Sequence, residues 1–190
     1  QICFNVTGCF MNALAKNTIY TIGHSTHSIE EFLAMLQSYD IKILADIRSL
    51  PGSRKFPQFD QQNLIISMAE NGIQYLHFPN LGGRRKPKKD SKNTRWNNPS
   101  FTGYADYMTT VTFLNAVEKK KKIASLKNTA IMCSEAVWWR CHRSMVSDYL
   151  KAKKWKVLHI MAIGKVQEHK YSSPAIIIGE HVIYSDEELE

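Results

Sequence analysis

Short apolar segments alternate with amphipathic ones along most of this 190-residue chain, and that alternation restricts the fold more than any other feature. Segments typical of buried strands occupy 18–24, 42–49, 73–79, 129–135 and 156–162. Helix-like segments lie between them, at 28–40, 61–72, 104–127 (one long helix or two) and 142–154. Strands that alternate with helices predict an α/β domain with a mostly parallel, five-stranded sheet and helices on both faces.

Local signals agree with this pattern at both ends of the chain. Ser28, followed three residues later by Glu31, forms a capping box and predicts the start of the first helix. The tail "PAIIIGEHVIY", residues 174–184, contains two short apolar runs around Gly179 and Glu180. Such a pattern predicts a C-terminal hairpin. We expect a single domain at 17–190, preceded at 1–16 by a leader or disordered tail.

The bulk composition excludes a membrane protein and a disulfide scaffold. No apolar run approaches the roughly 20 residues of a membrane-spanning helix. Two of the four cysteines lie in the first ten residues, which we leave out of the fold because Met11 could be the initiator. The other two, Cys133 and Cys141, indicate a reducing, cytoplasmic setting. Their C-x7-C spacing lacks the short C-x2-C of a zinc knuckle, so the sequence predicts no metal site there.

The chain is basic, with a formal net charge of +8, and much of that charge is local. Residues 84–95, "RRKPKKDSKNTR", contain seven Lys or Arg and one Asp. One interpretation is an exposed, solvated loop. The other is a nucleic-acid contact, in which Arg84, Arg85, Lys88 and Lys89 bind phosphates and release counterions.

Unusual polar residues follow the first four predicted strands. Gly23 to Thr26 follow the first, "DIRSLPGSRKFPQF" extends the second, "FPNLGGRR" extends the third, and Cys133, Ser134 and Glu135 end the fourth. Ligands of open α/β sheets bind outside the carboxyl ends of the strands. We therefore expect one pocket at this edge, with His24, Ser25, Ser53 and His142 among its lining.

Four ordered motifs, "TIGHST", "DIRSLPGSRKFPQF", "LGG" and "CSE…CHR", resemble the DUF488 family of small bacterial and archaeal proteins without an assigned activity. The match covers most of residues 18–162. Matching positions, in the D-x-R-x-x-P-x-S pattern and in the last motif, are Asp46, Arg48, Pro51, Ser53, Cys133, Glu135, Cys141, His142 and Arg143. The "VWW" inside the last motif departs from the family, which usually has more polar residues there. The resemblance implies an α/β fold and supplies no reaction.

The cysteine-rich segment predicts a reactive thiol. Cys141 lies at the predicted start of a helix, beside His142 and between Arg140 and Arg143. Helix N-termini and neighbouring cations lower the pKa of a thiol, so we expect Cys141 to be unusually acidic. Cys133, at a strand end, is interpreted as a small buried hydrophobe, with a catalytic role as the alternative.

The carboxylates and arginines of the same motifs suggest a phosphate site. Asp46 and Glu135 could divide acid and base roles or hold a divalent metal, although each could instead pair with an arginine and brace the loops. The candidate phosphate ligands are Arg48, Arg54 and Arg143.

Three functions remain open from the sequence. The first is an enzyme that acts on a nucleotide or nucleic-acid-type substrate, with Asp46, Cys133, Glu135 or Cys141 as catalytic residues. The second is a non-catalytic nucleic-acid-binding or regulatory module, and the third is a thiol redox or sulfur-transfer protein that uses both cysteines. Tyrosine-phosphatase chemistry is excluded because Cys133 and Arg140 form C-x6-R instead of C-x5-R. The glycine-rich loops of dinucleotide and P-loop sites are absent as well, and no cofactor is indicated.

Overall fold

The computed structural model describes residues 17–186; the expectations for 1–16 lie outside this range. The strands are β1 Thr18–Gly23, β2 Ile43–Asp46, β3 Gln74–His77, β4 Thr129–Cys133, β5 Lys156–Ala162, β6 Lys165–Glu168, β7 Ile176–Ile178 and β8 His181–Ile183. The α-helices are α1 Ile29–Gln37, α2 Gln61–Glu70, α3 Pro99–Met108, α4 Val111–Ala124 and α5 Arg143–Ala152. Short 3-10 turns occupy Pro57–Phe59, Pro79–Leu81 and Trp138–Arg140.

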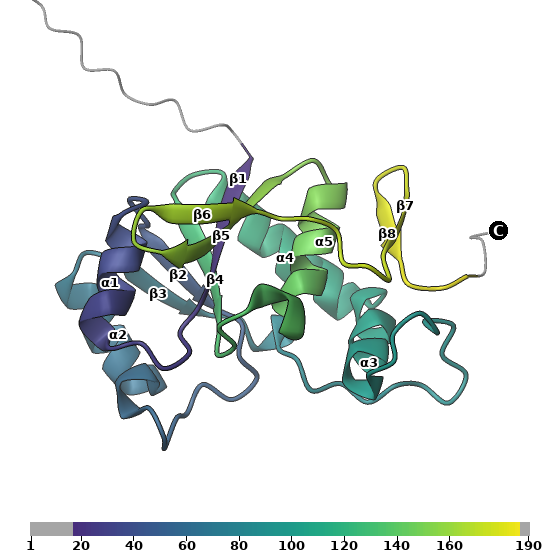
Figure 1. Ribbon diagram of the computed structural model, residues 1–190, viewed down its shortest axis with the longest axis horizontal. Helices are drawn as coiled ribbons and strands as arrows, with labels where there is room; N and C mark the ends of the chain where they lie inside the picture. The colour runs from purple at the N-terminus through teal and green to yellow at the C-terminus, as the bar shows by residue number, and fades with distance from the viewer. Residues whose placement is uncertain (1–16, 187–190) are drawn as a thin grey trace, which may run out of the picture.

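Six strands form the main sheet, in the order β3-β2-β4-β1-β5-β6 (Figure 1). The first five in sequence are parallel, as the alternation predicts. β6 pairs antiparallel with β5 and adds an edge strand that the sequence analysis missed. β7 and β8 form the expected hairpin.

Helices cover both faces of the sheet, and each face has its own core. On one face, α1 and α2 pack their apolar side chains on Leu44, Ala130 and Met132. On the other face, α3, α4 and α5 pack on the intervening residues Ala45 and Ile131. Figure 1 shows α1 and α2 to one side of the sheet and α4 and α5 to the other. The sheet is buried on both faces, and β2 and β4 accordingly consist mostly of apolar residues.

Local sequence explains the main helix boundaries. The side chain of Ser28 accepts a hydrogen bond from the backbone N–H of Glu31, which confirms the predicted start of α1. The segment predicted at 104–127 forms two helices, because Thr110 caps the start of α4 just after α3 ends. In the described range 17–186, no helix is both long and apolar enough to cross a membrane.

The topology places a crevice between β1 and β4. These strands are neighbours, with Gly23 opposite Cys133 at their carboxyl ends. The chain leaves β1 toward α1 on one face and leaves β4 toward α5 on the other. Neighbouring strands whose connections diverge in this way form a topological switch point, where ligands of α/β sheets bind.

A buried polar chain ties β1 and β5 to α5 and the C-terminal hairpin. Thr21 Oγ1 lies 2.6 Å from His159 Nδ1, and His159 Nε2 lies 2.9 Å from His169 Nδ1. His169 Nε2 continues the chain to Asp148 Oδ1 at 2.8 Å, and the hydroxyl of Tyr184 donates to Asp148 Oδ2. Burial, together with the charges of His169 and Arg143, lowers the pKa of His159 to about 2.

This network predicts a loss of stability in acid. The folded pKa of His159 lies below the ordinary value of about 6.5, so only the unfolded chain takes up this proton as the pH falls below about 6.5. His159 should therefore contribute up to about 1.4 kcal/mol of lost stability per pH unit in that range. His159→Gln keeps a donor and an acceptor without titrating. Urea unfolding at pH 7 and pH 5 should show a smaller loss for the variant; equal losses would contradict the assignment.

Candidate active site

Beyond the ends of β1 and β4, the two backbone segments remain hydrogen-bonded to each other. The backbone N–H of His24 donates to the carbonyl of Cys133, and that of Ser25 donates to the carbonyl of Ser134. Gly23 is required here, because a Cβ at this position would lie 1.8 Å from the carbonyl oxygen of Glu135. The chain after β4 therefore crosses directly over the end of β1.

Arg143 fixes the loop between β4 and α5. Its side chain is 2% exposed, and Nη2 donates to the carbonyl oxygens of Glu135 at 3.1 Å and Ala136 at 3.2 Å. The loop folds back through the Trp138–Arg140 turn, after which Cys141 precedes α5. Cys133 and Cys141, which lie eight positions apart in the sequence, are thereby brought together in space.

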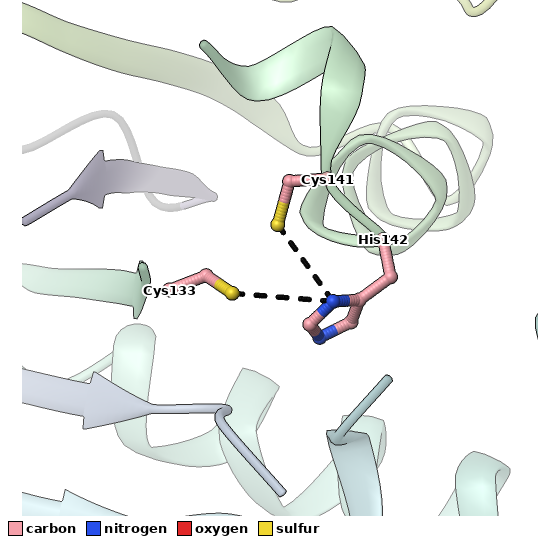
Figure 2. Close-up of side chains that lie close together, drawn as sticks. All are labelled: Cys133, Cys141 and His142. Atoms are coloured by element: carbon pink, nitrogen blue, oxygen red, sulfur yellow. Dashed lines mark hydrogen bonds between the residues drawn. The ribbon is translucent and has the colours of Figure 1, made fainter. Parts of the chain in front are cut away.

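Three side chains converge at this point: Cys133 from the end of β4, and Cys141 and His142 from the start of α5 (Figure 2). Nδ1 of His142 lies 4.0 Å from Sγ of Cys133 and 3.7 Å from Sγ of Cys141. The backbone N–H of Arg143 donates to Sγ of Cys141 at 3.4 Å. The cluster thus combines two sulfurs and one imidazole nitrogen that face one another.

The pKa values of the two thiols are shifted in opposite directions. The expectation that Cys141 is the more acidic thiol is wrong. Burial raises the pKa of Cys141 well above its ordinary value, because the thiolate would lose its hydration. A hydrogen bond from Cys141 lowers the pKa of Cys133 well below the ordinary value, and His142 and Arg143 act in the same direction. The sequence shows the helix start and the arginines, but it does not show that Cys141 is buried.

Asp46 lies in a buried ion pair. Its Oδ2 accepts from Arg48 Nη2 at 2.6 Å and from the hydroxyl of Tyr75 at 2.7 Å, while Oδ1 accepts from the backbone N–H and Nε of Arg48. Burial and the charge of Asp46 raise the pKa of Tyr75. Both carboxylate oxygens are engaged, as the bracing interpretation expects. Arg48 still reaches the pocket and also donates from Nη1 to the carbonyl of Phe59.

The other polar residues of the first two motifs shape the pocket wall. His24 is buried and stacks on Phe59, with ring centroids 4.3 Å apart, and burial lowers its pKa. Ser25 adopts a positive φ of 46° and turns the chain away from β1. Ser53 accepts a hydrogen bond from the backbone N–H of Phe56 and thereby orders the loop after β2.

A cleft of about 830 Å³ opens above these residues. Its lining includes His24, Ser25, Arg48, Ser53, Arg84, Cys133, Glu135, Arg140, Cys141 and His142. Three arginines and one carboxylate among these residues give the cleft a positive balance. A second groove of about 840 Å³, between β3 and α4, has a largely apolar lining without a cysteine.

The cleft contains some of the expected residues and leaves others out. Cys133, Glu135, Cys141 and His142 line it together, whereas Asp46 and Arg143 lie buried outside its lining. Arg54 is exposed and does not line it. Arg84, expected in a nucleic-acid surface, and Arg140, named in the sequence only as a neighbour of Cys141, line the cleft instead.

The basic loop 84–95 is held by a carboxylate that the sequence analysis did not identify. Asp106, on α3, accepts hydrogen bonds from the backbone N–H of Lys88 and from the side chains of Ser91 and Asn93. Arg85 lies 3.8 Å from the ring centroid of Tyr107 and is half-buried. Other cations of the loop, among them Arg84, Lys86, Lys88 and Lys89, remain exposed.

Gly83 is a further residue whose role the sequence did not reveal. A Cβ at Gly83 would lie 2.8 Å from Nδ1 of His142, so the loop after β3 packs directly against the imidazole. The "LGG" motif was the available signal, but the contact partner lies 59 positions away and cannot be identified from the motif alone.

The ion pair predicts a large stability effect at Asp46. Asp46→Ala leaves the buried guanidinium of Arg48 without its carboxylate and should cost about 3–5 kcal/mol. Asp46→Ala combined with Arg48→Met removes both charges and should recover much of that loss. Urea denaturation of the two variants measures the difference. Equal stability of Asp46→Ala and the parent would show that the pair does not brace the loops.

The close packing at Gly83 predicts a smaller loss of stability than the loss of the Asp46 carboxylate. Gly83→Ala should displace the His142 ring and cost about 1–3 kcal/mol through overpacking. The matched control is Gly52→Ala, because a Cβ at Gly52 would meet only an oxygen of Asp60 at an ordinary 3.8 Å. Thermal unfolding should separate the two variants; similar melting temperatures would contradict close packing at Gly83.

Comparisons with known proteins gave one family match. No curated protein and no solved structure matched the chain. The family model described as "Domain of unknown function DUF488" matches residues 28–150, a range that begins at the cap of α1 and ends in α5 and so includes the loops of the cleft after β2, β3 and β4. The match covers well over half of the chain, and the chain therefore belongs to the DUF488 family.

Proposed function

We propose that this protein is an enzyme that binds a phosphate-bearing substrate, of nucleotide type, in the cleft at the carboxyl ends of β1, β2 and β4. One observation carries the proposal: the cleft combines a cationic wall with a cluster of two thiols and an imidazole. The arginines alone would indicate a site that only binds anions, and the thiols and the imidazole alone could be part of a buried core. Together they provide binding and chemistry in one cavity.

The arginines supply the binding half of the proposal. Arg84 and Arg140 are exposed, line the cleft and make no ion pair with an acidic side chain of residues 17–186. Guanidinium groups suit phosphate oxygens because they donate two parallel hydrogen bonds. Arg48 lies deeper, where its pairing with Asp46 positions the remaining donor of Nη1 toward His24, at 3.5 Å.

The cluster supplies the chemical half. Cys133 and His142 line the cleft, and Glu135 offers an exposed carboxylate beside them. A carboxylate beside a bound substrate can act as a general acid or base, and thiols and an imidazole can supply a nucleophile or metal ligands. Asp46 is not part of this proposal, because both of its oxygens are engaged in the ion pair.

A second candidate function is a nucleic-acid-binding module. The observation that favours it is the exposed row Lys86, Lys88 and Lys89, which continues from Arg84 at the rim of the cleft. A polyanion bound in the cleft could extend along this loop. The two proposals differ in ligand size: the enzyme binds a mononucleotide through Arg84 and Arg140, while the module needs the lysines and a longer strand.

Calorimetric titration with AMP and with pyrophosphate tests the cleft. Arg84→Ser and Arg140→Ser should each weaken binding by about 1 kcal/mol, roughly fivefold in Kd, because each removes one exposed cation–phosphate pair. Lys165→Ser is the matched control, since Lys165 is exposed on β6 and lies outside the cleft. Stability should not change in any of these variants.

Three outcomes separate the proposals. Loss of AMP affinity in the arginine variants alone supports the enzyme. Unchanged AMP affinity, with single-stranded DNA or RNA affinity lost when Lys86, Lys88 and Lys89 become Ser, supports the binding module. If no phosphate compound binds the parent protein, both proposals are rejected.

A further inference from the structure

We propose that Cys133, Cys141 and His142 form a zinc site with three protein ligands and a fourth position open to the cleft. The sequence predicted no metal here, because C-x7-C-H does not resemble a zinc knuckle. The β4–α5 loop folds back on itself, and this brings the three ligand atoms together despite their spacing in the sequence. The use of the open position by a substrate rests on the proposed function, whereas the metal binding itself does not.

The distances between the three ligand atoms suit a tetrahedral ion. Bonds of about 2.3 Å to sulfur and about 2.0–2.1 Å to nitrogen place sulfur and nitrogen about 3.6 Å apart and two sulfurs about 3.8 Å apart. Here the nitrogen lies 3.7 Å and 4.0 Å from the two sulfurs, and all three atoms lie within 4.8 Å of one another. Small side-chain movements bring all three atoms within bonding distance of one ion.

The orientation of the ligands also suits a metal. Both sulfurs face Nδ1 of His142, Cys133 from the end of β4 and Cys141 from the residue just before α5 (Figure 2). When Nδ1 binds a metal ion, the ring proton of His142 lies on Nε2, which is buried and has no hydrogen-bond partner in residues 17–186. Gly83 packs against the ring and restricts its rotation.

Arg143 provides the charge that two thiolates need. Its Nε and Nη1 are buried and have no hydrogen-bond partner among the described residues. Its backbone N–H already donates to Sγ of Cys141. Two thiolates, a divalent cation and Arg143 together carry a net charge of +1, which favours an anionic substrate over a cationic one.

The surroundings indicate an open site with one vacant ligand position. The cluster offers three protein ligands within residues 17–186, and all three line the cleft. Structural zinc sites are closed by four protein ligands, whereas catalytic ones keep a position for water or substrate, and a Cys2His set occurs in such sites. Thiolate and imidazole ligands favour zinc over magnesium or calcium. Zinc here would polarise a phosphate oxygen or a bound water.

Cobalt substitution tests the site directly. The metal-free, reduced full chain is titrated with Co²⁺, which should give thiolate-to-cobalt charge-transfer absorption and the visible bands of four-coordinate cobalt, saturating at one ion per chain. Zn²⁺ should abolish the spectrum, because it binds such sites more tightly. Cys133→Ser, Cys141→Ser and His142→Gln should each weaken Zn²⁺ binding by at least about 100-fold.

Matched controls exclude binding elsewhere in the chain. The double variant Cys3→Ser, Cys9→Ser removes the other two cysteines, and His181→Gln removes an exposed imidazole on β8. Both should keep the full cobalt spectrum. A measurement without ligand variants protects against misfolding: Zn²⁺ should slow the reaction of Cys133 and Cys141 with N-ethylmaleimide relative to the metal-free parent protein, as read by peptide mass spectrometry.

The outcomes separate the metal from the proposed function. No cobalt spectrum, a spectrum lost with Cys3 and Cys9, or no protection of Cys133 and Cys141 would overturn the zinc site, even if AMP binds through Arg84 and Arg140. Inorganic phosphate added to the cobalt form should shift the visible bands. An unchanged spectrum would overturn the open position while leaving the metal in place.

Discussion

The hydrogen bonds from the buried guanidinium of Arg143 to the carbonyls of Glu135 and Ala136 determine the shape of the site. They hold the chain after β4 across Gly23, where any side chain would collide with it. The loop must then return toward the sheet, and its return places Cys141 beside Cys133. Only Nη2 is satisfied by these carbonyls, and Nε and Nη1 are buried without a hydrogen-bond partner among residues 17–186. Because burying a guanidinium is costly, the two carbonyls are needed to hold Arg143 here, and Arg143 in turn holds the loop.

The sequence predicted the sheet because strand and helix periodicities differ and every long element carries one of them. It also predicted which edge of the sheet would carry polar residues, since the motifs follow the strand ends. It could not predict how those residues are used. Asp46 and Cys133 both end buried strands, yet one is fully paired with Arg48 and the other faces the cleft. That difference depends on side chains from neighbouring strands, such as Tyr75 on β3, which donates a hydrogen bond to Asp46.

The features that the sequence missed are short or non-local. β6 is four residues long and mostly polar, so it gives no periodic signal; its register with β5 depends on the turn at Gly164. The acidity of the thiols depends on burial, and burial reverses the order expected from the helix start alone. The approach of Gly83 to His142 joins two motifs that are far apart in the sequence.

Four arginines in or near the cleft divide into two groups by burial. Arg48 and Arg143 are buried and hold loops, so their charges are fixed before any ligand arrives. Arg84 and Arg140 are exposed and line the cleft, and in the proposed function they are the arginines that contact the ligand. Asp46 balances the charge of Arg48, whereas no ion pair with an acidic side chain of residues 17–186 balances Arg143, so Arg143 adds a fixed positive charge near the cleft. Because Arg48 and Arg143 also hold loops, only Arg84 and Arg140 can be replaced to test the proposed ligand binding without destabilising the domain.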